Sequence, residues 1–114
     1  MNIDDFSFHD ASILEVRETS AQNIDFLIDY CSDWQNNVFE KRILSFKGVI
    51  TYNIDEIPVA GRITILKIIN LGRYTKTFGV DKNQFETVIN KIQMQTNAGD
   101  RTIEYSECEL TSPQ

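Results

Sequence analysis

Residues 39–55, FEKRILSFKGVITYNID, form the longest stretch of the chain with a readable hydrophobic period. Apolar side chains recur at even-numbered positions and polar side chains at most odd-numbered positions, which is typical of a β-strand with one buried face. The even-numbered apolar residues are Leu44, Phe46, Ile50, Tyr52 and Ile54. The stretch therefore predicts that one face packs into a core while the other faces water.

A straight strand from residue 39 to residue 55 does not fit a domain of this size. It would reach roughly 55 Å at about 3.3 Å per residue, whereas a compact domain of this length has a radius of gyration of about 13 Å. Gly48 is the expected break, because a glycine inside a strand marks a bulge or, with Lys47, the centre of a tight hairpin. The stretch is then one curved strand or two strands, with the same residues in the core.

Four further segments have strand patterns. Residues 12–19 and 24–30 alternate and are joined by a short polar turn at residues 20–23, which predicts a hairpin. Residues 62–71, RITILKIINL, are apolar at both parities, which predicts a central strand buried on both faces. Residues 101–110 resume the alternation, and a change of parity near Ser106 predicts a bulge.

Residues 85–96, FETVINKIQMQT, fit both a helix and a strand. Their apolar residues have helical spacing in the first half and a common strand parity in the second. The Asn-Ala-Gly-Asp turn at residues 97–100, with another strand behind it, favours a strand. We therefore predict an all-β fold, or an α+β fold with one short helix near residues 81–92, in which six to eight strands form a mainly antiparallel, curved, barrel-like or sandwich-like sheet.

Composition places the chain, residues 1–114, in the class of single soluble domains. Seventeen acidic against eleven basic residues give a net charge of −6 and an isoelectric point near 4.6, which disfavours nucleic acid and anionic membranes as partners. The first residues lack the basic start and apolar run of a secretory signal, so we expect a cytoplasmic protein. Cys31 and Cys108 are expected to be free thiols, since two cysteines are too few for a zinc motif.

The sequence offers little catalytic chemistry. His9 is the only histidine, which excludes a two-histidine metal site. His9 and Asp10 are not expected to pair, because adjacent residues of an extended chain point to opposite sides. No phosphate-binding loop, dinucleotide-binding glycine run or nucleophile motif is present. We predict a protein that is not an enzyme and has no metal or cofactor; an enzyme that uses His9 with a non-adjacent carboxylate is the third alternative.

The candidate partner-binding residues are acidic side chains around the only tryptophan. They are Asp25, Asp29, Asp33, Trp34 and Glu40. Four residues of strand separate the first two carboxylates by about 13 Å, too far to share one metal ion. They form either a solvated acidic stripe or, in the functional interpretation, an acidic docking face for a basic partner. The tryptophan, in the polar loop SDWQNN, is either a lid over the core or an exposed binding anchor.

The chain resembles uncharacterised small bacterial single-domain proteins that begin with Phe-His-Asp-Ala, here residues 8–11. In those proteins a hairpin leads to a loop with tryptophan, here Asp33-Trp34, then to a Leu-x-Phe-x-Gly-Val strand, here residues 44–49, and an Asn-Ala-Gly hairpin closes the chain, here residues 97–99. Such proteins are similar to the immunity proteins encoded beside polymorphic bacterial toxins. The resemblance implies inhibition by binding and brings no catalytic residues.

The leading hypothesis for function is therefore a non-enzymatic, immunity-type inhibitor that binds a basic toxin or nuclease through its acidic face. The alternative is a β-domain that binds a small ligand between the curved stretch and residues 62–71. An unpaired strand edge would allow a homodimer as well as a monomer.

Overall fold

A computed structural model describes residues 1–20 and 22–113 of the chain. It contains eight strands and two short 3-10 turns: η1 (Ile3–Asp5), β1 (Ser12–Ser20), β2 (Asn23–Asp33), β3 (Val38–Lys47), β4 (Thr51–Glu56), β5 (Ile63–Phe78), η2 (Asp81–Asn83), β6 (Phe85–Thr96), β7 (Gly99–Tyr105) and β8 (Glu107–Thr111). The all-β prediction is confirmed. In the described ranges no helix has the length and apolar character needed to cross a membrane.

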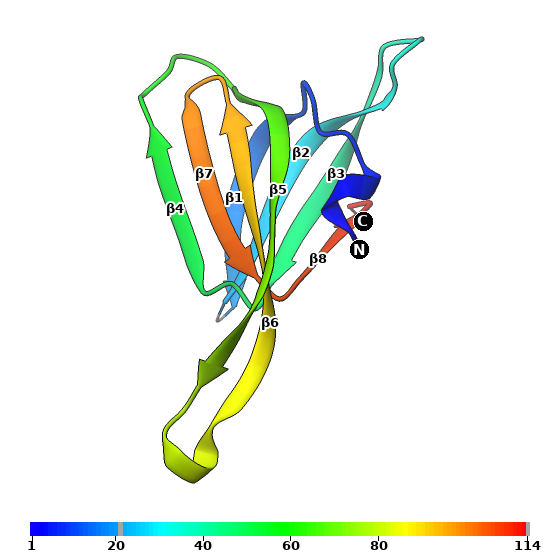
Figure 1. The fold of residues 1–114 in the computed structure, drawn as a ribbon. Helices are drawn as coiled ribbons and strands as arrows, with labels where there is room; N and C mark the ends of the chain where they lie inside the picture. Colours follow the sequence, from blue (N-terminus) through cyan, green and yellow to red (C-terminus); the bar gives the residue numbers. More distant parts are fainter. Residues whose placement is uncertain (21, 114) are drawn as a thin grey trace.

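The strands form one antiparallel sheet in the order β4-β7-β6-β5-β1-β2-β3-β8, and the sheet is not closed. It has two halves, β4-β7-β6-β5 and β1-β2-β3-β8, which are joined through a short pairing of β1 with β5 (Figure 1). That pairing involves only Ser12 with Thr64 and Ile13 with Ile63. Because the link is short, the halves can fold towards each other as in a sandwich.

The core lies between the two halves. Edge-to-face ring contacts cross it, with centroids 4.9 Å apart for Phe46 and Tyr105 and 6.0 Å apart for Phe26 and Tyr52. The other fully buried large side chains are Ile28, Leu44, Ile65, Ile92, Met94 and Ile103, with Ile89 buried separately. One expected core residue, Ile54, is exposed, because the second half of β4 lies at the free end of the sheet.

The curved stretch forms two strands that do not pair with each other, so it is neither one continuous strand nor a tight hairpin. Its first part, β3, pairs with β2 and β8, and its second part, β4, pairs with β7. Gly48 makes the bend at φ +64°, and Ser106, between β7 and β8, donates its N–H to the Lys47 carbonyl at 3.0 Å. The two paired segments thus turn the same corner side by side. The bulge predicted near Ser106 is instead a break between β7 and β8 at this residue.

The prediction that residues 62–71 are buried on both faces is wrong. In β5 only Ile65 is fully buried, while Leu66 and Leu71 are exposed. The reason is that β1 leaves β5 after the first two residue pairs, so most of β5 has β6 as its only strand neighbour. Apolar character at both parities does not reveal where a neighbouring strand ends.

The conflict over residues 85–96 is resolved in favour of a strand. β6 spans Phe85–Thr96 and pairs with β5 along its whole length, and the only helical turn nearby is η2. The helical alternative is wrong. The β1–β2 hairpin is also confirmed, although residue 21 of its predicted turn lies outside the described part of the chain.

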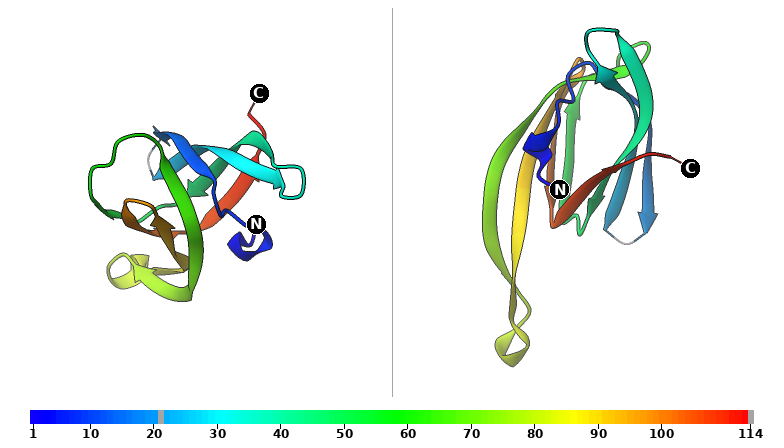
Figure 2. Two further views of the ribbon diagram at one scale, coloured as in Figure 1. Left: turned by 90° about the horizontal axis from the view of Figure 1, so that it is seen from above. Right: turned by 90° about the vertical axis from the view of Figure 1, so that its right-hand side faces the viewer.

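Residues 71–89, hereafter the arm, extend beyond the body as a two-stranded ribbon (Figures 1 and 2). β6 pairs with β7 only from Asn90 onward, so within residues 1–20 and 22–113 no third strand pairs with the arm. The radius of gyration is 15.3 Å, against about 13 Å for a compact domain of this length. The elongation of the molecule, 56 × 29 × 25 Å, is largely due to this ribbon.

Candidate functional site

The most distinctive surface feature is a pair of rings at the β2–β3 turn. Trp34 lies in that turn and stacks on His9, which comes from the segment before β1, with centroids 5.7 Å apart and an interplanar angle of 20°. The tryptophan remains 50% exposed. It is therefore an exposed side chain with one supported face, and not a lid over the core.

Asp33 builds the turn that carries the tryptophan. Its carboxylate accepts hydrogen bonds from the backbone N–H groups of Gln35 (3.0 Å) and Asn36 (3.2 Å) and from the Asn36 side-chain amide (2.7 Å). These bonds, chiefly the one from the Asn36 side chain, lower the pKa of the Asp33 carboxyl. The carboxylate thus fixes the backbone on either side of Trp34 while it remains charged at neutral pH.

His9 is held by the body of the protein. Its Nδ1 lies 2.8 Å from the carbonyl oxygen of Leu66 on β5, so this nitrogen carries the proton and donates. Its Nε2 lies 3.5 Å from Asp10 Oδ1. The prediction that His9 and Asp10 point apart is wrong, because Asp10 adopts φ +65° in a turn and donates its N–H to the Ile65 carbonyl at 2.8 Å.

The Phe-His-Asp-Ala segment has a clear division of roles. Phe8 and Ala11 are buried, and the Phe8 ring packs edge-on against Tyr30 with centroids 5.7 Å apart. The two middle residues face outward beside the tryptophan turn. The buried ends anchor the segment, and the middle supports an exposed aromatic surface.

The five predicted partner-binding residues do not share one face of the sheet. Asp29 lies opposite Lys41 in the register and 3.7 Å from Arg62. Glu40 lies opposite Tyr30, on the face that also carries the buried Ile28, and pairs with Arg42. Asp25 is on the outer face with Asp29, at a position opposite Ser45. The structure groups only Asp33 and Trp34, and joins them to His9.

A second polar cluster, buried between the halves, escaped the sequence-based reasoning. Arg101 donates from Nε and Nη2 to the two Glu56 carboxylate oxygens and from Nη1 to the Tyr52 hydroxyl, each at 2.8 Å. The Glu56 and Arg101 side chains are 7% exposed, and the Thr96 hydroxyl donates to Glu56. The Arg101 hydrogen bonds lower the pKa of the Glu56 carboxyl. The alternation of the strand could have revealed this cluster, because Arg101 lies on the same strand face as the buried Ile103.

This inner cluster has the geometry of a structural ion pair. Arg101 borders a cleft of about 520 Å³ between β1 and residues 61–63, yet its guanidinium is engaged with Glu56 and Tyr52.

Both cysteines are buried free thiols, and burial raises the pKa of Cys108. In residues 1–20 and 22–113 no three His, Cys, Asp or Glu side chains converge as metal ligands would.

Comparison of the chain with models of protein families, with curated proteins and with solved structures gives no match. The functional proposal therefore rests on the geometry and charge of the molecule itself. Of the two polar clusters, the one at Trp34 is exposed, whereas the Glu56–Arg101 pair is buried.

Proposed function

We propose that this protein is a non-enzymatic protein-binding module of the immunity type, which blocks a basic protein such as a toxin or nuclease. The observation that supports it is the half-exposed Trp34 ring, held from below by His9 and from the side by the turn that Asp33 builds. Tryptophan is enriched at binding hot spots. A ring that is already ordered loses little conformational entropy on binding, which favours affinity.

Charge supports a basic partner. The chain carries a net charge of −6, and Asp33 lies directly beside the ring while Asp10 lies beside His9. Acidic groups around a docking surface speed the encounter with a positively charged protein and disfavour acidic partners. Asp25, Asp29 and Glu40 contribute to this long-range field in our proposal, and the direct contact is assigned to Trp34 and Asp33.

The test starts from affinity capture with the tagged protein from its host lysate, followed by titration of the captured protein against variants. Trp34→Ala should weaken the complex by about tenfold or more, the loss expected at a hot spot. Asp33→Asn, which keeps the side-chain shape, should slow association mainly at low salt. Ile57→Ala, at another highly exposed apolar position, is the matched control and should bind as the parent does.

Thermal unfolding of each variant separates binding from folding. An unchanged midpoint with weakened binding supports the proposal, because Trp34 is then a contact residue. If Trp34→Ala binds as tightly as Ile57→Ala, or if no basic protein is captured, the proposal is wrong.

A further inference from the structure

The arm gives the chain more surface than a compact monomer has. The accessible surface is 7126 Å², whereas a monomer of 13.2 kDa exposes about 6,400 Å². The surplus is close to the roughly 800 Å² that each partner buries in a standard protein interface. Val80 and Phe85, at the tip, are 73% and 61% exposed. The surplus accessible surface and the exposed apolar side chains at the tip are both expected of a surface that a protein partner covers.

The arm also differs from the body in charge. It carries three basic residues, Arg73, Lys76 and Lys82, and two acidic residues, Asp81 and Glu86, so its formal charge is +1 in a chain of −6. Within the described ranges, none of the three cations lies within ion-pair distance of a carboxylate, whereas most cations of the body do. These three cations are therefore available to individual carboxylates of a partner.

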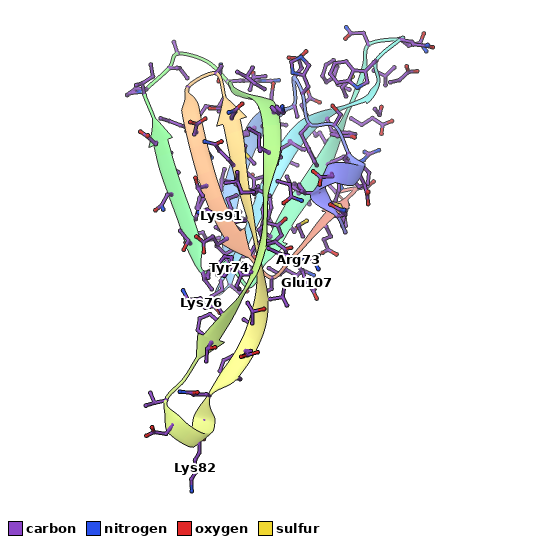
Figure 3. The ribbon with its side chains drawn as sticks, viewed as in Figure 1. Arg73, Tyr74, Lys76, Lys82, Lys91 and Glu107 are labelled. Atoms are coloured by element: carbon purple, nitrogen blue, oxygen red, sulfur yellow. The ribbon has the colours of Figure 1, made fainter. Side chains whose placement is uncertain are left out.

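A cavity of about 530 Å³ lies at the root of the arm. Arg73 and Glu107 line it, beside Ile3 and Tyr105. Among the described residues neither Glu107 nor Arg73 forms an ion pair within 4 Å; Glu107 lies opposite Lys47 in the register, but the Lys47 ammonium pairs with Glu109. Figure 3 shows Arg73 and Glu107 near the root and Lys82 at the opposite end of the arm. The cavity therefore combines a free cation, a free carboxylate and apolar side chains.

We propose that a second copy of the chain covers the arm, in a two-fold symmetric dimer whose arms lie antiparallel and whose tips enter each other's root cavity. The tip sequence Val80-Asp81-Lys82 offers an apolar group, an anion and a cation. In the dimer Asp81 faces Arg73 of the other copy and Lys82 faces Glu107 of the other copy. The charges at the two ends of the arm are thus complementary.

The length of the arm fits this arrangement. Residues 73 to 78 extend about 17 Å at about 3.3 Å per residue, and the η2 turn lengthens the ribbon further. Two such ribbons side by side in opposite directions place each tip at the root of the other. Each contact is made twice about the two-fold axis, so the assembly closes as a dimer and does not continue as a filament. The docking surface around Trp34 is not used, so this inference is independent of the proposed function.

Sedimentation equilibrium of the full chain, from micromolar to submillimolar concentration, tests the proposal. The parent chain should dimerise reversibly, and Lys82→Glu and Glu107→Lys should each weaken dimerisation about tenfold or more, because each reversal repels at two symmetric contacts. The double variant Lys82→Glu/Glu107→Lys should recover most of the affinity, since the pair is restored with its signs exchanged. Lys67→Glu, at a body cation without an ion-pair partner, is the charge-matched control and should dimerise as the parent does.

The dimerisation constants of these variants either support or overturn the tip-to-root contact. Recovery in the double variant, with unchanged circular dichroism in all variants, supports the tip-to-root contact. A parent chain that is monomeric throughout, a Lys82→Glu variant that behaves as Lys67→Glu does, or a double variant no better than the single ones overturns it.

Discussion

The body and the arm use the same kinds of side chain in opposite ways. In the body, the buried Arg101 shares three hydrogen bonds with Glu56 and Tyr52 between the two halves of the sheet. In the arm, Arg73, Lys76 and Lys82 have no carboxylate partner within the described residues, and large apolar groups face water. The buried cation of the body is thus satisfied internally, whereas the three cations of the arm stay available to a carboxylate of a partner. The arm still bonds to the body through its Tyr74 hydroxyl, which donates to Glu104. Variants that disturb each region test this difference.

The largest effect is expected from Arg101→Met. It leaves the Glu56 carboxylate buried without its cation, and removal of one member of a buried pair costs about 3–5 kcal/mol of unfolding free energy. Urea denaturation followed by circular dichroism measures the loss. The double variant Arg101→Met/Glu56→Leu should recover much of it, because both charges are gone. A loss below about 1 kcal/mol in Arg101→Met, within the range of exposed ion pairs, would mean that water solvates the cluster.

A smaller loss, about 2 kcal/mol, is expected from Gly48→Ala at the corner of the sheet. The left-handed φ of +64° costs an L-residue about 1 kcal/mol, and the new Cβ would lie 2.5 Å from Ser106 Oγ. Gly72→Ala, at the root of the arm, has φ +98° but no atom within 4 Å of its Cβ, so it should cost only the backbone strain. In a Ser106→Gly background the two costs should become similar; if they stay apart, the corner clash is not the cause.

How well the sequence predicted these two regions depends on how local each signal is. The limits of β6 and the bend at Gly48 follow from alternation, turn residues and glycine, which act over a few residues. The exposure of Leu66 follows from the point at which β1 leaves β5, a contact between segments far apart in the chain. Local pattern therefore predicted the limits of the strands, in the arm as in the body, better than it predicted which of their residues are buried.

The candidate sites divide in the same way. The polar loop SDWQNN marked Trp34 as a residue of interest, but its exposure depends on the stack with His9. The turn at Asp10 depends on a hydrogen bond to Ile65, which no local pattern shows. Arg101 is the opposite case. Its parity, shared with Ile103, points inward, but its partners Glu56 and Tyr52 lie on the neighbouring strand β4, and no local pattern shows that pairing.

The pH dependence of stability should also report on the buried pair of the body. The pKa of Glu56 is lowered in the folded state, chiefly by the Arg101 hydrogen bonds, so its contribution is complete above the ordinary glutamate pKa of about 4.5 and is lost as the pH falls below it through the folded value. Urea midpoints between pH 7 and pH 3 should therefore fall less steeply in Glu56→Gln than in the parent. Equal slopes in Glu56→Gln and in the parent would show that this buried pair of the body does not carry the pH dependence.

The smallest effect is expected from Phe85→Ser at the tip of the arm. The ring is 61% exposed and its stacking partner, Phe78, belongs to the same ribbon, so in dilute solution the unfolding free energy should change by no more than about 0.5 kcal/mol. Hydrogen exchange on the same samples should show the amides of residues 75–78 opening well below the free energy of global unfolding, because two strands without a third neighbour are only marginally stable. A loss of unfolding free energy above about 1 kcal/mol, or protection of the arm amides equal to that of the Ile92 amide, would show that the ribbon unfolds cooperatively with the body. The contrast between a body with internally paired polar groups and a separately unfolding arm would then no longer hold.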